Sequence, residues 1–141
     1  MKIDGTRSND RATEVVLAYL SAFNRGDWAA MLELLDDGVV HDFNPGQRQT
    51  GKSAFAAYLH ARSETREKLR DIVVMTSPDG ARAAAEYMAH GESGTGADVP
   101  GRRGSHRQRY MLPGGMFFAV REGRIERISN YQQRSGATPG G

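Results

Sequence analysis

The sequence has no cysteine, no long apolar run and almost no imbalance of charge. Without cysteine, the chain has no disulfide, no thiol nucleophile and no thiolate metal ligand. No stretch approaches the roughly 20 apolar residues that a membrane span requires, and residues 1–10 lack the apolar core of a signal peptide. We therefore expect a soluble, cytoplasmic protein that has no membrane partner.

The charge balance argues against a nucleic-acid partner. The 19 lysines and arginines nearly match the 17 aspartates and glutamates, which leaves a net charge of +2. The basic cluster from Arg102 to Arg109 lies in or beside a glycine-rich stretch. It lacks the interleaved aromatic residues on which single-stranded nucleic acid stacks. We interpret this cluster as a solvated loop that continues into a strand.

The length of 141 residues fits one domain. We predict a disordered lead-in over residues 1–9, a folded domain over 10–133 and a disordered tail over 134–141, because the two ends are polar or rich in glycine and proline. Apolar residues at helical spacing predict a helix that Asp10 caps, a second that begins at Asp27 and a third that begins at Thr50 or Gly51. A polar stretch continues the third segment to Arg70.

The second half of the chain has the period of strands. We predict strands over 72–76, 82–90, 107–112, 116–121 and 124–132, in addition to a short one over 39–43. Residues 91–104 predict a long loop, and Glu122-Gly123 predicts a tight turn. Helices followed by a run of antiparallel strands indicate an α+β fold, whose concave side suits a small-molecule site.

Four segments, in this order and spacing, resemble one family. They are Tyr19–Asp27, Leu35–Asp42, Gly51–Tyr58, and Gly123–Ile125 followed by Asn130-Tyr131. Over residues 12–132 the chain resembles SnoaL-like and ketosteroid isomerase-related proteins of the NTF2-like superfamily. The resemblance implies a cone in which three N-terminal helices pack on a curved, mostly antiparallel six-stranded sheet. It also implies a homodimer.

The resemblance further implies a catalytic pair, Asp42 and Tyr19. Asp42 occupies the position of the family's general base, whose carboxylate moves a proton between carbons. The simpler alternative is an aspartate that caps the turn at 44–46. Tyr19 matches the tyrosine that donates to a substrate oxyanion. The alternative that stays open is that Tyr19 is an aromatic core residue whose hydroxyl bonds to a neighbouring residue. A second oxyanion-holding acid is missing, because Leu112-Pro113 falls at its expected position.

Seven further residues are candidates for substrate binding. Glu86 lies in the strand over 82–90, where either face can point inward, so a solvent-facing glutamate is the alternative. Asn130 and Gln132 face inward if they follow Ile128, and Tyr110 is placed to bind a carbonyl or carboxylate. Aromatic residues of the helices predict an apolar pocket wall; they are Phe55, Tyr58 and Trp28.

The sequence also offers candidates for a metal site and for a nucleotide-binding loop. The four histidines lie on separate elements without the close spacing of metal ligands, so we predict no metal. Gly46–Ser53 matches the phosphate-binding pattern G-x-x-x-x-G-K-[ST]. A phosphate-binding loop of that type belongs to a parallel sheet of β-α units, whereas the rest of this chain predicts antiparallel hairpins. We therefore predict no nucleotide cofactor.

These observations favour a cofactor-free enzyme that transfers a proton on a hydrophobic carbonyl or polyketide-like substrate. Isomerisation, cyclisation and dehydration all use such a step. Two alternatives stay open at this point. One is a non-catalytic protein of the same fold that binds a hydrophobic small molecule. The other is water addition of the epoxide hydrolase type, for which we assign no Asp-Arg-Asp relay.

Overall fold

The structure is a computed structural model that describes residues 2–43, 46–62, 66–93 and 108–132, with backbone only for 2–9, 66, 93, 108 and 132. Of the predicted loop over 91–104, residues 91–93 instead end a strand, and residues 94–104 lie outside the described part, as does the predicted tail. The elements in chain order are α1 (Lys2–Arg25), α2 (Trp28–Glu33), β1 (Leu35–Asp42), β2 (Arg48–Thr50), α3 (Lys52–Ala61), β3 (Arg66–Thr76), β4 (Arg82–Ser93), β5 (Gln108–Arg121) and β6 (Arg124–Gln132).

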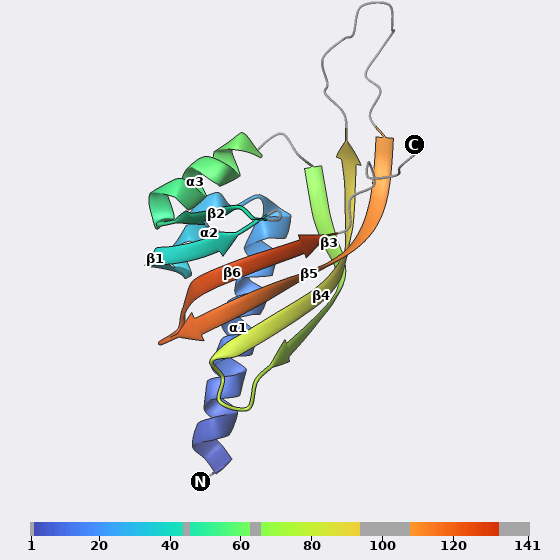
Figure 1. The fold of residues 1–141 in the computed structure, drawn as a ribbon. Helices are drawn as coiled ribbons and strands as arrows, with labels where there is room; N and C mark the ends of the chain where they lie inside the picture. The colour runs from blue at the N-terminus through green and yellow to red at the C-terminus, as the bar shows by residue number, and fades with distance from the viewer. Residues whose placement is uncertain (1, 44–45, 63–65, 94–107, 133–141) are drawn as a thin grey trace, which may run out of the picture.

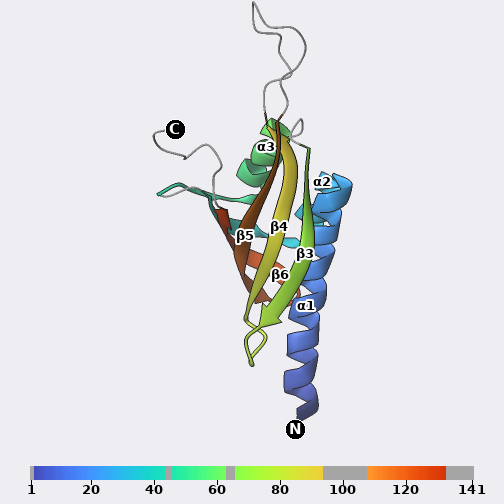
Figure 2. The same cartoon turned by 90° about the vertical axis from the view of Figure 1, so that its right-hand side faces the viewer.

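The six strands form one sheet in the order β2-β1-β6-β5-β4-β3. Only the β1–β6 pair is parallel, and the other neighbouring pairs are antiparallel. The helices lie on one face of this curved sheet, while the described part of the chain leaves the opposite face uncovered (Figures 1 and 2). We call the helix-covered side the inner face and the other side the outer face. The predicted α+β class and the mostly antiparallel six-stranded sheet are confirmed.

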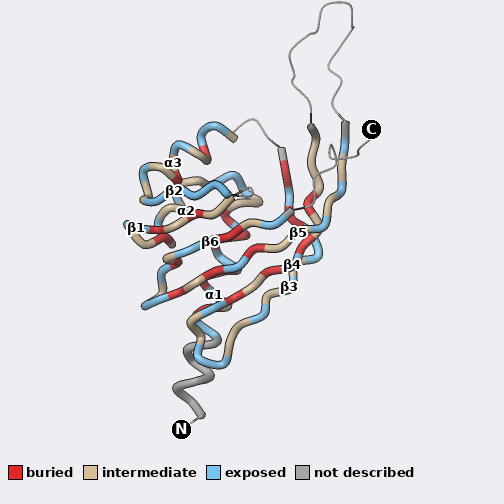
Figure 3. Tube along the Cα trace, viewed as in Figure 1, coloured by how far each residue is buried: buried red, intermediate tan, exposed pale blue. Residues whose placement is uncertain are grey.

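Buried residues lie along the strands of the sheet and on the helix segments that cover it (Figure 3). Along β4, Ala83, Ala85, Tyr87 and Ala89 are buried, whereas Glu86 between them is exposed. This alternation is the period of two expected of a strand with one covered face. Apolar residues of α1, including Val16 and Leu20, are fully buried against it. Within the described residues, no helix is both long and apolar enough to cross a membrane.

Asn24, near the end of α1, bonds to the edge strand β3. Its amide nitrogen donates to the Leu69 carbonyl at 3.0 Å, and its amide oxygen accepts from the Leu69 N–H at 2.8 Å. Lys68 also donates to the Asn24 carbonyl. These bonds satisfy backbone groups that an edge strand otherwise leaves open, and they place Glu67 and Leu69 on the inner face.

The helices differ from the prediction in three respects. Helix α1 begins at Lys2 rather than at Asp10. Helix α2 has only six residues, and α3 follows β1 and β2, so the three helices are not all N-terminal. Helix α3 ends at Ala61, and the polar segment that follows belongs partly to β3. Exposed polar segments lack the apolar periodicity that separates a helix from an edge strand.

The strands differ too. The sequence missed β2, whose three residues pair with β1 as an antiparallel hairpin before α3. A hairpin of this kind is not the β-α unit of a nucleotide-binding loop, so the match at Gly46–Ser53 spans a turn, strand β2 and the start of α3. The two strands predicted over 107–112 and 116–121 are one strand, β5. The Glu122-Gly123 turn is confirmed, and both residues have positive φ, 52° and 78°, as a two-residue type I′ turn requires.

Candidate functional site

Strand β1 sends His41 and Asp42 to opposite faces of the sheet. His41 is only 2% exposed, and its ring lies 4.8 Å from the Phe55 ring of α3, so it faces inward. Asp42 points to the outer face, because successive side chains in a strand alternate. The prediction that Asp42 shares a side with Tyr19 is therefore wrong.

Two arginines hold Asp42 on the outer face. Arg48 of β2 donates to both carboxylate oxygens, at 2.6 and 3.1 Å, and Arg127 of β6 donates to Oδ2 at 3.2 Å. The hydroxyl of Ser129 adds a bond of 3.3 Å. The bond from Arg48 is the main reason that the pKa of Asp42 falls to about 2. A group with that pKa is a weak base near neutral pH, so Asp42 serves to join three neighbouring strands.

His41 is held in place at both ring nitrogens. Its Nε2 lies 2.9 Å from Oδ1 of Asn130, and its Nδ1 lies 3.3 Å from Nε2 of Gln49. The amide N–H of Gln49 donates to Nδ1, so Nε2 carries the proton and donates to Asn130, which describes a neutral imidazole. Burial lowers the pKa of His41, in agreement with this form. Three aromatic rings surround it: Phe43, Phe55 and Tyr58.

A second carboxylate, Glu67 of β3, lies on the inner face. Its side chain is 6% exposed, and its Oε1 lies 3.8 Å from the Arg62 guanidinium. The Tyr110 hydroxyl donates to Oε2 at 2.6 Å, a length typical of a hydroxyl bonded to an ionised carboxylate. Burial and this bond raise the pKa of Tyr110. Arg62 also lies over the Tyr58 ring at 5.4 Å, so one cation links α3 to β3.

Tyr19 projects from α1 into the same interior. It is 3% exposed, and its ring meets Phe118 edge to face at 5.8 Å. Burial raises the pKa of its phenol strongly, and the nearby phenols of Tyr58 and Tyr87 add to this effect. Among the described residues its hydroxyl has no hydrogen-bond partner. Buried tyrosine hydroxyls usually have one, so this protonated donor is available to a bound molecule.

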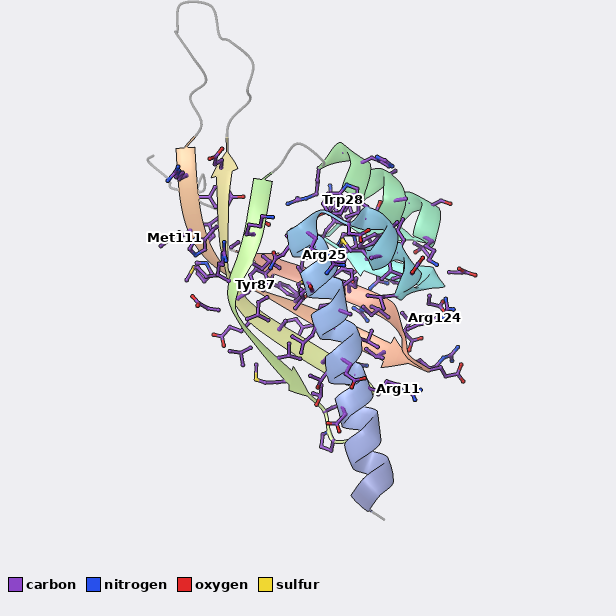
Figure 4. The ribbon with its side chains drawn as sticks, turned by 180° about the vertical axis from the view of Figure 1, so that it is seen from behind. Arg11, Arg25, Trp28, Tyr87, Met111 and Arg124 are labelled. Atoms are coloured by element: carbon purple, nitrogen blue, oxygen red, sulfur yellow. The ribbon has the colours of Figure 1, made fainter. Side chains whose placement is uncertain are left out.

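Several phenols of the inner face have raised pKa values. Burial, followed by Tyr58 and Tyr87, raises the pKa of Tyr19, and burial together with Glu67 raises the pKa of Tyr58 and of Tyr87. Figure 4 shows Tyr87 on the side of the sheet next to α1. We call the resulting group the inner polar cluster; its members are Tyr19, Tyr58, Arg62, Glu67, Tyr87 and Tyr110. Donors and one carboxylate thus converge on the inner face.

The structure brings some of the predicted substrate-binding residues to the inner face and not others. Phe55, Tyr58, Tyr110 and Asn130 lie there. The prediction for Glu86 is wrong, because Glu86 is exposed on the outer face, one position from Tyr87. Trp28 packs against Phe23, with ring centroids 6.3 Å apart, at the end of the molecule formed by α2 and α3 (Figure 4). For Gln132 the backbone pairs with Gly114, and its side chain lies outside the described part.

Sequence reasoning missed Glu67, Arg62 and the inward direction of His41. For Glu67 a signal exists, since Glu67 and Leu69 alternate with exposed Lys68 and Arg70 in a strand pattern. Over the residues that the structure describes, no three His, Asp or Glu side chains are placed to hold a metal ion.

Residues 16–128 match the SnoaL-like domain family. This chain belongs to that family, because the match covers most of its length. No curated protein sequence matches the chain.

Three solved structures are similar over most of their length and of this chain. A candidate polyketide cyclase from Xanthomonas campestris pv. campestris is 48% identical, with a TM-score of 0.79, and the match covers 88% of this chain and 91% of that one. One from Pseudomonas putida KT2440 is 47% identical, with a TM-score of 0.77 and coverages of 89% and 92%. One from Silicibacter sp. TM1040 is 37% identical, with a TM-score of 0.77 and coverages of 89% and 90%.

Proposed function

We propose that this protein is an enzyme that transfers a proton on a hydrophobic carbonyl compound held at the inner face. The reaction class is isomerisation, cyclisation or dehydration, without a cofactor. Membership of the SnoaL-like family supports this proposal, as do relatives named as candidate polyketide cyclases. The observation that carries it is the Tyr19 phenol, a buried donor without a hydrogen-bond partner among the described residues.

The chemistry asked of Tyr19 is stabilisation of an oxyanion. When a base removes a proton from the carbon beside a carbonyl, negative charge develops on the carbonyl oxygen. A buried phenol that donates to this oxygen stabilises the enolate more than it stabilises the ketone. The raised pKa of Tyr19 keeps the phenol protonated, so it donates rather than repels. Return of the proton to another carbon gives isomerisation, and attack of the enolate on a second carbonyl gives ring closure.

The test compares Tyr19→Phe with the wild-type enzyme. A panel of β,γ-unsaturated ketones and linear polyketide-like diketones is followed by absorbance and NMR. We expect turnover of the best substrate to fall about 10²-fold, the usual loss when one oxyanion donor is removed. Tyr131→Phe is the matched control, because Tyr131 is 62% exposed on the outer face, and its turnover stays at the wild-type value.

Two results contradict this function. Equal turnover by Tyr19→Phe and wild type removes the phenol from the mechanism. Tight binding of panel ligands with no turnover by wild type assigns the chain to non-catalytic binding proteins of this fold instead.

A further inference from the structure

Three hydrogen-bonded side chains connect the β1–β2 hairpin to the inner face; we call Gln49, His41 and Asn130 the relay. Gln49 of β2 lies across from His41 in the sheet, and its Nε2 is 3.3 Å from Nδ1 of His41. The other ring nitrogen, Nε2, lies 2.9 Å from Oδ1 of Asn130 on β6. Both contacts fit the same neutral tautomer, which carries its proton on Nε2. The two bonds therefore donate in one direction, from Gln49 toward Asn130.

The direction of these bonds sets the orientation of the Asn130 amide. Because Nε2 of His41 donates, the amide turns its oxygen toward the ring. The other arm of the amide is an NH₂ group with two hydrogens to donate, and it is turned away from His41. Within the part of the chain that the structure describes, this NH₂ group has no hydrogen-bond partner. The relay thus leaves a donor, and not an acceptor, available at Asn130.

The surroundings of the His41 ring preserve this direction. Phe43 stacks on the ring at 4.9 Å, and the rings of Phe55 and Tyr58 lie 4.8 and 4.7 Å away, so the imidazole has little room to turn. Burial lowers the pKa of His41, which keeps the ring neutral near neutral pH. A protonated ring would donate from both nitrogens and could no longer accept from Gln49.

The inner face is accessible around Asn130. Ile128, two residues earlier on the same face of β6, is fully buried, whereas Asn130 is only partly buried. On β5, Leu112 shares the inward side with buried Met116 and is itself partly exposed. Tyr58 of α3 is partly exposed too. A small molecule can therefore reach the Asn130 amide from this end of the inner face.

We propose that the Asn130 amide binds a ligand here by donating to an ester- or lactone-type oxygen on an otherwise apolar molecule. Such an oxygen accepts hydrogen bonds and donates none, which matches a site that offers N–H groups. The apolar body of the ligand matches the partly exposed Leu112 and Tyr58 side chains on the same side. His41 and Gln49 are positioning residues, which act through Asn130. The assignment rests on the ligand site of the proposed function and deepens it by naming the recognised group.

The first measurement determines the direction of the relay without a ligand. A proton–nitrogen NMR spectrum of the imidazole side chains distinguishes a proton on Nε2 from one on Nδ1. In the wild type we expect His41 to carry its proton on Nε2. Gln49→Leu removes the donor to Nδ1, so either tautomer can bond to the Asn130 amide, and both should appear. Gln47→Leu is the matched control, because Gln47 is exposed two residues earlier, and it should keep the wild-type tautomer.

The second measurement compares the affinities for coumarin, a bicyclic lactone, and 1,2-dihydronaphthalene, a hydrocarbon with the same ring skeleton. NMR titrations give the ratio of the two affinities, in which the shared apolar contribution cancels. Asn130→Asp still accepts from His41 but has no N–H, so the ratio should fall about tenfold against coumarin. In Gln49→Leu the ratio should fall by the same factor as the population of the Nε2 tautomer, and in Gln47→Leu it should not change. Asn130→Leu decides the outcome if circular dichroism shows that Asn130→Asp is unfolded.

Three results contradict this assignment. A proton on Nδ1 of His41 in the wild type would mean that Asn130 presents its oxygen to the ligand. A wild-type ratio in the folded Asn130 variant, or no binding of either probe by the wild type, would remove Asn130 as a ligand-binding donor. A wild-type tautomer and ratio in Gln49→Leu would remove Gln49 as a positioning residue. None of these measurements requires turnover, so they are independent of the Tyr19→Phe comparison, which tests the proposed function.

Discussion

Two carboxylates of this chain lie beside arginines, and their positions give them different chemistry. Asp42, on the outer face, receives three bonds from the guanidinium groups of Arg48 and Arg127. Glu67, on the inner face, accepts from a phenol and lies 3.8 Å from its arginine. Tight pairing fixes the charge of a carboxylate. Asp42 is therefore structural, whereas Glu67 links the inner ends of β3 and β5 through Tyr110.

We predict that Asp42→Asn lowers stability and not proton transfer. The pKa of Asp42 is about 2 in the folded chain, below its usual 3.8. A depressed carboxylate pKa stabilises the fold above about pH 4, and this stabilisation is lost as the pH falls toward 2. Because both arginines are half exposed, we expect a loss of only about 1 kcal/mol at pH 7. Urea unfolding of both proteins at pH 7 and pH 2 measures it.

The pH dependence separates this explanation from simple loss of packing. The difference between wild type and Asp42→Asn should shrink as the pH falls from 4 to 2. A constant difference in the free energy of unfolding over this range would mean that the loss of stability comes from packing. A stable Asp42→Asn protein without turnover would place Asp42 in the reaction after all.

At the scale of single residues, the sequence predicts which way a side chain points only where the apolar residues of an element fall on one face. The apolar spacing of α1 places Tyr19 inward, and the structure confirms it. In β1 the adjacent Val39 and Val40 are both apolar, so either alternation fits. The correct one follows from contact between His41 and Phe55, residues of separate elements. Glu67 was missed because its segment is polar, and Leu69 is the only apolar residue between Arg66 and Arg70 that indicates the covered face.

At the scale of elements, strands β4 and β5 place tyrosines over glycines. The Tyr87 ring lies across from Gly114, and the Tyr110 ring lies across from Gly91. A Cβ on Gly114 would lie 2.7 Å from the Tyr87 ring, and one on Gly91 would lie 2.4 Å from the Tyr110 hydroxyl. Both rings need a residue without a side chain opposite them. These two cross-strand pairs fix the direction of two phenols of the inner polar cluster.

We predict that Gly114→Ala destabilises the protein by about 1–3 kcal/mol, the usual cost of overpacking. Gly115→Ala is the matched change one residue along β5, where the nearest atom is the Ala85 carbonyl oxygen at 3.4 Å. We expect its effect to stay below about 0.5 kcal/mol. Guanidinium unfolding of the two variants measures the difference. Equal stabilities would mean that Tyr87 does not lie over Gly114 in solution.

The glycine pairs also explain why the sequence divided β5 in two. Pro113-Gly114-Gly115 has the composition of a turn, and a local interpretation ends a strand there. In the sheet, the glycines accommodate the Tyr87 ring of the next strand, and β5 continues. The same limit applies to β2, whose short polar sequence has no strand pattern of its own. Its pairing depends on β1, eight residues earlier at the His41–Gln49 pair.

At the scale of the whole molecule, the helices cover one face of the sheet, and the outer face keeps several large apolar side chains at its surface. Phe117 and Tyr131 are 54% and 62% exposed and meet edge to face at 5.5 Å. Met75 and Met111 are more than half exposed, and Val73 is half exposed. Figure 4 shows Met111 at the margin away from the helices. Exposed apolar groups of this kind mark association surfaces.

We therefore predict a homodimer in which the outer faces of two copies meet about a two-fold axis, the commonest symmetry of soluble oligomers. Light scattering coupled to size exclusion should give twice the mass of one chain. Phe117→Glu should shift the protein to monomer, because the two copies would together bury two uncompensated carboxylates in the interface. Leu17→Glu is the control, since Leu17 is 45% exposed on α1 rather than on the sheet, and it should remain dimeric. A wild-type monomer at all concentrations, or equal dissociation by both variants, contradicts this interface.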